Sequence, residues 1–140
     1  MLEKIMPRKI WLEASSICQL RCVQCWHSNS SSLKWSAVGI GYLKFSDFKN
    51  LVDDNPWVKE IELSNWGEIF LNPELLDIIK YAYWHDVGLT ADNGVNLNDV
   101  EEEVLEGLVK YKFLSIRCSI DGASNDTYKI YRINGNYDKV

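Results

Sequence analysis

The chain has 140 residues, a formal net charge of −5 and 46% hydrophobic residues. This length fits about one domain, and this apolar content is enough for a packed core. The acidic balance argues against a nucleic-acid-binding module, which normally carries a basic surface. No apolar stretch is long enough to cross a membrane or to serve as a signal peptide. We therefore expect a soluble cytoplasmic protein whose four cysteines serve a metal or redox function rather than disulfides.

Segments with the patterns of strands and helices alternate along the chain. Strand-like apolar stretches occupy residues 9–14, 58–64, 88–91 and 113–120. Segments with helix-capping residues and helical apolar spacing begin at Ser46, at Pro73, at Asn98 and at Ser124 or Asn125. The alternation predicts an α/β fold with a parallel sheet, about four βα units and right-handed crossovers.

The unusual loops of the chain all lie at the ends of predicted strands. A cysteine-rich loop follows the first strand, and Gly67-Glu68 and Asn93-Gly94 follow the second and third. Ser119 and Asp121 stand at the end of the fourth. Since the chemistry of parallel α/β sheets gathers at the carboxyl ends of the strands, we expect these residues to form one site.

The cysteine-rich loop contains Cys18, Cys22 and Cys25 in the spacing C-x3-C-x2-C. Three thiolates complete neither a tetrahedral zinc site nor the four-cysteine shell of an ordinary iron–sulfur cluster. Such a site leaves one metal position for another ligand. One candidate for that ligand is His27, which would complete a zinc site in a binding module.

With these loops in register, the chain resembles the radical S-adenosylmethionine (SAM) superfamily. The cysteine spacing on the first βα loop is similar to its cluster-binding motif, and Trp66-Gly67-Glu68 is similar to its GGE segment. The chain also resembles the SPASM-type peptide and enzyme maturases, and this likeness extends from about Ile10 to Val140. Its segments are Phe70-Leu71-Asn72-Pro73-Glu74-Leu75, Ser119-Ile120-Asp121-Gly122, and Tyr131-Arg132 with Gly135-Asn136-Tyr137-Asp138.

The resemblance implies a [4Fe-4S] cluster held by Cys18, Cys22 and Cys25, with SAM on the fourth iron. Reductive cleavage of SAM would give methionine and a 5′-deoxyadenosyl radical that abstracts hydrogen from a substrate. The resemblance further implies an electron donor such as flavodoxin or ferredoxin, and a peptide or protein as substrate. It indicates neither a nucleic acid nor a membrane as partner.

The resemblance also implies which residues bind the amino-acid end of SAM. Glu68, with the backbone of Gly67, would bind the ammonium group, because a carboxylate is the natural partner of a cation. Arg132 would pair with the SAM carboxylate. Considered alone, Glu68 could equally be a solvated loop carboxylate, and Gly67 a simple turn residue.

Ser119 and Asp121 would bind the ribose hydroxyls of SAM, with Asn93 as a further contact. Each also has a simpler interpretation. Ser119 and Asp121 could cap a turn and the last helix, and Asn93-Gly94 alone is a turn signal. Cys118, within the fourth strand, is expected to be a buried apolar cysteine rather than a ligand. Arg117 beside it would need a carboxylate partner inside a barrel, either Glu62 or Glu13.

Some positions depart from the motifs of the superfamily. Gln24 replaces a common aromatic residue, Trp66 the first glycine of the GGE form, and Ile69 a common proline. None of these changes removes a predicted ligand. The superfamily core is a partial (β/α)6 barrel, so four units predict an incomplete one. We expect residues 1–140 to be the N-terminal portion of a radical SAM core domain, truncated at the C-terminus. A catalytically inactive fragment is the third hypothesis.

Overall fold

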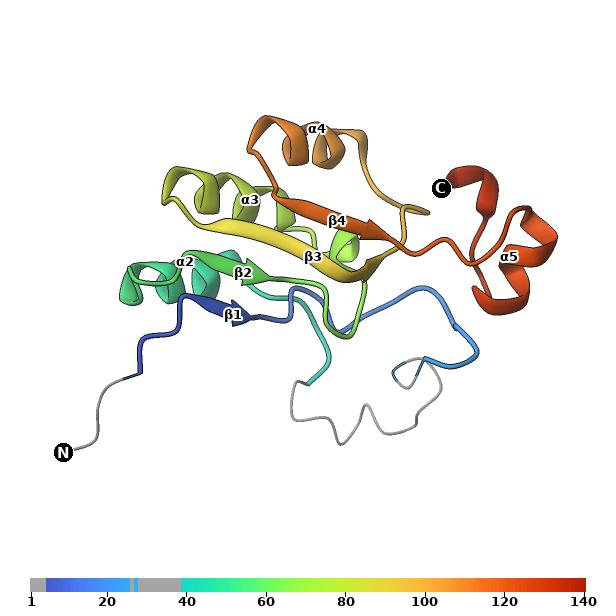
Figure 1. Cartoon of the computed structure of the whole chain (residues 1–140), viewed down its shortest axis with the longest axis horizontal. Helices are drawn as coiled ribbons and strands as arrows, with labels where there is room; N and C mark the ends of the chain where they lie inside the picture. The colour runs from blue at the N-terminus through green and yellow to red at the C-terminus, as the bar shows by residue number, and fades with distance from the viewer. Residues whose placement is uncertain (1–4, 26, 28–38) are drawn as a thin grey trace.

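The computed structural model describes residues 5–25, 27 and 39–140. Four parallel strands form one sheet in the order β1-β2-β3-β4 (Figure 1). The strands are β1 (Lys9–Trp11), β2 (Glu60–Glu62), β3 (Gly88–Val95) and β4 (Ser115–Cys118). The helices are α2 (Phe45–Asp54), α3 (Leu75–Trp84), α4 (Glu102–Lys110) and α5 (Asn125–Tyr131), with short 3-10 turns η2 (Ile69–Leu71) and η3 (Tyr137–Lys139). The predicted parallel α/β arrangement is confirmed.

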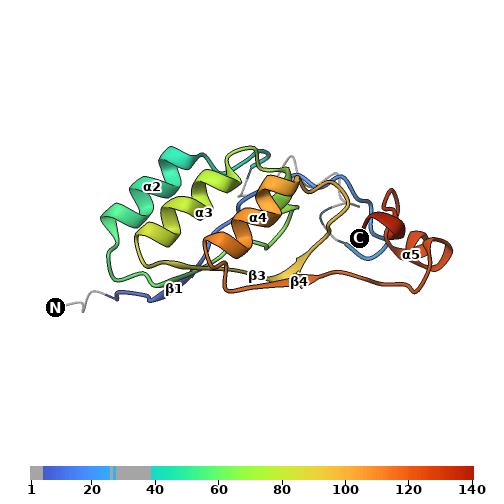
Figure 2. The same cartoon turned by 90° about the horizontal axis from the view of Figure 1, so that it is seen from above.

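Helices α2, α3 and α4 all cover the same face of the sheet (Figure 2). Alternate strand residues such as Ile61 and Leu89 point to this face and form the core with Phe48, Ile78 and Ile79 from the helices. In the described part of the chain, no helix covers the opposite face of the sheet. Nor is any described helix long and apolar enough to pass through a bilayer.

The opposite face carries a polar network around the buried carboxylate of Glu62. Its oxygens accept hydrogen bonds from the hydroxyls of Ser64 and Thr90, both at 2.6 Å, and from the backbone N–H of Asp92. Burial alone would raise the pKa of Glu62, but these bonds outweigh it and lower the pKa below its ordinary value. Arg117 is exposed to solvent, and among the described residues it forms no ion pair with Glu62 or Glu13, the partners it would need inside a barrel.

Two predicted helix starts differ in the structure, and for α2 the cap comes from a distant segment. Ser46 is not the N-cap of α2; Lys44 occupies that position, and the carboxylate of Glu74 accepts the N–H of Phe45. Pro73 does not start α3, which begins at Leu75. Such long-range caps leave no local sequence signal.

The last two helices differ in how well their starts follow the sequence. Asn98 does not cap α4, because its side chain donates to the hydroxyl of the buried Tyr128 at 3.1 Å. Glu101 stands at the N-cap position instead. Ser124 does cap α5, in a reciprocal capping box with Thr127, as predicted.

Strand β3 is longer than the sequence indicated. It continues through the predicted loop at Asn93 and Gly94 to Val95, with an irregular register against β4. Gly94 has a φ of 114°, which a residue with a side chain rarely adopts. A Cβ atom there would lie 2.5 Å from the Oγ of Ser119. The irregularity therefore brings the end of β3 directly against the residue that follows β4.

Asn72 joins three segments below the site, and we expect its removal to be costly. Its buried side chain donates to the carbonyls of Ala14 at 2.8 Å and Leu43 at 3.0 Å, and accepts the N–H of Glu74 at 2.8 Å. Asn72→Ala strands buried backbone groups, so it should lower the free energy of unfolding by about 2–3 kcal/mol. Urea unfolding measures the change. The exposed Asn50→Ala on α2 is the matched control, and equal stability of both variants would contradict the prediction.

Candidate functional site

The carboxyl ends of the strands surround a cavity of about 190 Å³. Its wall consists of the cysteine loop, the turns after β2 and β4, the end of β3 and the segment after α5. The lining residues are Cys18, Leu20, Cys22, Cys25, Ser64, Asn65, Trp66, Gly67, Glu68, Asn93, Gly94, Val95, Asn96, Ser119 and Arg132. Of the predicted site residues, all but Asp121 line this cavity.

The cysteine loop is held in place from both of its ends. At its start, the Ser15 hydroxyl accepts the N–H of Ile17 at 3.1 Å. Further along, the N–H groups of Arg21 and Val23 donate to the carbonyls of Ile133 and Tyr131, at 3.0 and 3.2 Å. The loop thus leaves β1 and crosses to the end of α5, as Figure 1 shows.

The three thiols lie close enough to influence one another. Burial raises the pKa of Cys18 to about 11, and the nearby Glu68, Cys22 and Cys25 act in the same direction. Several acidic groups therefore share one cavity. Bound cations would stabilise them as thiolates, as they do in iron–sulfur and zinc proteins.

Glu68 is almost fully buried at the N-terminal end of η2. One carboxyl oxygen accepts the backbone N–H and the side-chain amide of Asn96, both at 2.6 Å, and the other accepts the N–H of Phe70 at 3.3 Å. Despite these bonds, burial raises the pKa of Glu68 to about 7. A cationic ligand would favour the carboxylate, and the bonds to Asn96 hold it in place against the end of β3.

Arg132 brings a positive charge to the cavity wall. Its guanidinium pairs with the carboxylate of Asp121 and donates to the Sγ of Cys22 at 3.3 Å. Burial disfavours the charged guanidinium, but the contacts with Cys22 and Asp121 outweigh it and raise the pKa of Arg132. Asp121 lies outside the cavity lining and reaches the site through this arginine.

Asn93 and Ser119 also line the cavity. The backbone N–H of Asn93 donates to the Ser64 hydroxyl at 3.2 Å, and its side chain donates to the Asn65 amide oxygen at 3.2 Å. The N–H of Ser119 donates to the carbonyl of Val95 at 2.8 Å. Backbone contacts thus fix both positions.

A single metal ion is not supported by the arrangement of the donors. Among the described residues, no three His, Cys, Asp or Glu side chains are placed to hold one ion. His27 is buried, and within the described part of the chain its Nδ1 has no hydrogen-bond partner. The thiols nevertheless share one cavity. A cluster of several irons, whose cysteine ligands lie further apart than the ligands of one zinc ion, is compatible with this donor set.

Two residues of the site were not identified from the sequence. Asn96 orients Glu68 and accepts a bond at 3.2 Å from the amide of Gln19, within the cysteine loop. Glu13 accepts hydrogen bonds from the turn that precedes Glu68. The position of Asn96 just after a parallel strand was a usable signal, whereas the bonds of Glu13 span more than fifty positions.

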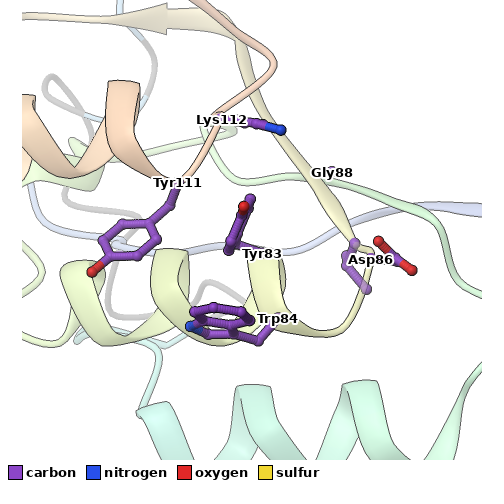
Figure 3. A pocket seen from close by; sticks show the side chains of 7 residues that line it. Tyr83, Trp84, Asp86, Gly88, Tyr111 and Lys112 are labelled. Atoms are coloured by element: carbon purple, nitrogen blue, oxygen red, sulfur yellow. The ribbon is translucent and has the colours of Figure 1, made fainter.

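A larger cavity, of about 510 Å³, lies at the other end of the sheet where β3 begins (Figure 3). Tyr83 at the end of α3 lies between Trp84 and the residues that follow α4, Tyr111 and Lys112. This cavity contains no cysteine and none of the predicted site residues. Size alone therefore does not identify the functional site in this chain.

Sequence comparison finds relatives, although no protein-family model matches the chain. The chain is 29% identical over 127 residues to an AdoMet-dependent heme synthase of Methanosarcina barkeri. It is 25% identical over 128 residues to the mycofactocin maturase MftC of Mycobacterium tuberculosis. Each match covers 90% of this chain but 34% and 30% of the relatives, so the chain spans about a third of their length.

Solved structures share the fold of the chain at low sequence identity. SuiB of Streptococcus suis bound to S-adenosylmethionine has a TM-score of 0.76 at 14% identity, covering 96% of this chain and 29% of SuiB. BtrN in complex with AdoMet and 2-DOIA has a TM-score of 0.59 at 16% identity, covering 79% of this chain and 44% of BtrN. These likenesses confirm the predicted incomplete parallel (β/α) barrel.

The buried Glu68 should make the stability of the cofactor-free protein depend on pH. Its pKa of about 7 in the fold exceeds its ordinary value of 4.5, so unfolding releases a proton between these pH values. The free energy of unfolding should therefore fall by about 2–3 kcal/mol as the pH rises through this interval. Thermal unfolding at pH 5 and pH 8 measures the effect.

The Glu68→Gln variant should lose most of this dependence on pH, because glutamine does not titrate. The exposed Glu106→Gln on α4 is the matched control and should keep it. The raised pKa would be contradicted if the free energy of unfolding of the wild type, compared with that of Glu68→Gln, were higher at pH 8 than at pH 5.

Proposed function

We propose, for a chain whose sequence relatives and structural neighbours are radical SAM enzymes, that it is the N-terminal portion of a radical SAM core domain. Residues 1–140 would hold the cofactors of an enzyme. The chain spans about a third of its relatives, so the activity of the whole protein is part of the proposal.

The convergence of three thiols with Glu68 and Arg132 on one cavity carries the proposal. Cys18, Cys22 and Cys25 would ligate three irons of a [4Fe-4S] cluster, and the fourth iron would be open to SAM. The cluster and SAM, when bound, supply reductive cleavage of SAM and abstraction of a hydrogen atom from substrate. The protein contributes an anchored loop and positioned charges.

The remaining residues would orient SAM. Glu68 would accept hydrogen bonds from the SAM ammonium. That positive charge would then favour the ionised form of Glu68 despite its burial. Arg132 would offer its guanidinium to the SAM carboxylate while remaining bound to Asp121. Ser119 would bind the ribose hydroxyls, with Asn93 as a further contact, whereas Asp121, predicted as a second ribose ligand, would act through its ion pair with Arg132.

A peptide or protein is the substrate class that we propose. One relative is named a mycofactocin maturase, and a structural neighbour, SuiB bound to the precursor peptide SuiA, has a TM-score of 0.72. A second relative is named a heme synthase, so tetrapyrrole chemistry is the alternative to test beside it. A flavodoxin or ferredoxin would donate the electron, in the cytoplasm.

The three cysteines of the loop should each be needed for the cluster. After anaerobic reconstitution, we expect the whole reading frame that contains this chain to be brown and to hold iron and sulfide. Cys18→Ala, Cys22→Ala and Cys25→Ala should each lose most of both. Cys118→Ala is the matched control, because Cys118 lies in β4 outside the cavity, and it should retain them.

Cleavage of SAM by the reconstituted protein is the measurement that decides between the hypotheses. With SAM and dithionite, the reconstituted protein should release 5′-deoxyadenosine. Bound zinc without iron or sulfide would favour the zinc-stabilised module. Absence of both 5′-deoxyadenosine and any spectral change on adding SAM would overturn the proposed function.

Arg132 should contribute directly to SAM affinity. Loss of one charge-assisted hydrogen bond costs about 1.5–3 kcal/mol, so Arg132→Gln should weaken SAM binding by about 10- to 100-fold. Calorimetric titration of reconstituted protein measures it. Lys139→Gln, which removes only an exposed contact with Asp99, should bind SAM like the wild type. An unchanged dissociation constant in Arg132→Gln would contradict this role.

A further inference from the structure

Glu13 lies just beyond β1, and its carboxylate faces the turn after β2. Its Oε1 accepts the backbone N–H groups of both Trp66 and Gly67, each at 3.1 Å. Hydrogen bonds from N–H groups to a carboxylate are stronger than those between neutral groups. Two successive N–H groups directed at one oxygen form a small anion-binding site in the backbone.

The next residue of the turn is bound to the same stretch of chain. The N–H of Glu68 donates to the carbonyl of Ile17 at 2.8 Å. Three consecutive N–H groups, from residues 66–68, are therefore bound to the segment that runs from Glu13 into the cysteine loop. The position of Glu68 is set relative to Cys18, which directly follows Ile17.

Gly67 allows the two segments to touch. A Cβ atom at this position would lie 2.6 Å from the carbonyl oxygen of Ile17 and closer still to that of Ser15. These are backbone atoms, which cannot move aside without displacing the loop. The contact leaves no room for a side chain, so hydrogen bonds rather than side-chain packing hold the turn.

The second carboxylate oxygen of Glu13 shows that the contact between Glu13 and the turn is not an ion pair. Among the described residues, its buried Oε2 has no hydrogen-bond partner. Burial raises the pKa of Glu13, while the bonds from Gly67 and Trp66 oppose the increase. The turn therefore needs only one acceptor oxygen at this distance from the backbone of Glu13. A glutamine side chain has the same length and also supplies one.

We propose that Glu13 is a positioning residue that holds residues 66–68 against the cysteine loop and thereby places Glu68 for SAM. This inference rests on the proposed function. A single SAM molecule would have to reach both the cluster that Cys18 would help to hold and the carboxylate of Glu68. The distance between these two points is set by the backbone contact that Glu13 secures.

The test compares three substitutions of Glu13 in the whole, anaerobically reconstituted protein. Glu13→Gln keeps an oxygen at the same reach and should bind SAM within about 3-fold of wild type. Glu13→Ala removes the acceptor, and Glu13→Asp shortens it by one methylene. Both should weaken SAM binding by about 10-fold, the effect expected for lost bonds to a charged group. Iron and sulfide contents should stay the same in all three.

Hydrogen exchange of the cofactor-free protein gives a reading that does not depend on SAM. Amides in a peptide covering residues 63–70 should exchange faster in Glu13→Ala and Glu13→Asp than in wild type or Glu13→Gln. Glu60→Ala is the matched control, because Glu60 forms only an exposed pair with Lys9 on the neighbouring strand. Its exchange in residues 63–70 and its SAM affinity should not change.

Three outcomes would overturn the inference. The first is a Glu13→Ala variant that keeps both the SAM affinity and the hydrogen exchange of the wild type. The second is a Glu13→Asp variant that binds SAM more tightly than Glu13→Gln. That result would mean that the charge of the side chain matters, and not its length. This comparison also decides the case if Glu13→Ala fails to fold. A wild-type protein that binds no SAM would overturn the proposed function as well, whereas normal binding with unaffected variants overturns only the role of Glu13.

Discussion

The close backbone contact between Gly67 and residues 15–17 holds the site together. The chain leaving β1 and the turn after β2 approach so closely that only a hydrogen atom fits between them at Gly67. Glu13 and the carbonyl of Ile17 bind the three N–H groups of that turn. Because one side of the contact leads into the cysteines and the other carries Glu68, the two cannot move independently.

The cavity beside this contact concentrates acidic groups. Thiols and a carboxyl group are buried together, and burial raises the pKa of both Cys18 and Glu68. Without a cation, the neutral forms are therefore favoured. Arg132 supplies one positive charge and already shares it with Asp121 and Cys22. This imbalance is the electrostatic reason for our proposal that the site binds iron and an ammonium group.

The sheet supports the site from one face only. Helices α2, α3 and α4 bury the apolar strand residues, whereas the opposite face carries the network around Glu62 (Figure 2). Strand β4 is at an edge of the sheet, and Leu114 beside it is 59% exposed. An exposed apolar edge can pair with further chain.

The sequence by itself determined the order of strands and helices, the parallel sheet and the gathering of the cysteines, Glu68 and Ser119 at one end. These features follow from local periodicity and from the geometry of βα units, which depend on near neighbours in the chain. The cap of α5 at Ser124 was likewise readable, because its partner Thr127 is three residues away.

Only the tertiary structure decided the contacts that position the site. Glu74 caps α2 from another helix, Asn96 orients Glu68, and Arg132 reaches Cys22 across the fold. Glu13 reaches the turn at Gly67 in the same way. Each bond joins residues far apart in sequence, and its donor and acceptor have no pattern that distinguishes them from exposed polar residues. Their partners are chosen by packing, which a local reading of the sequence does not contain.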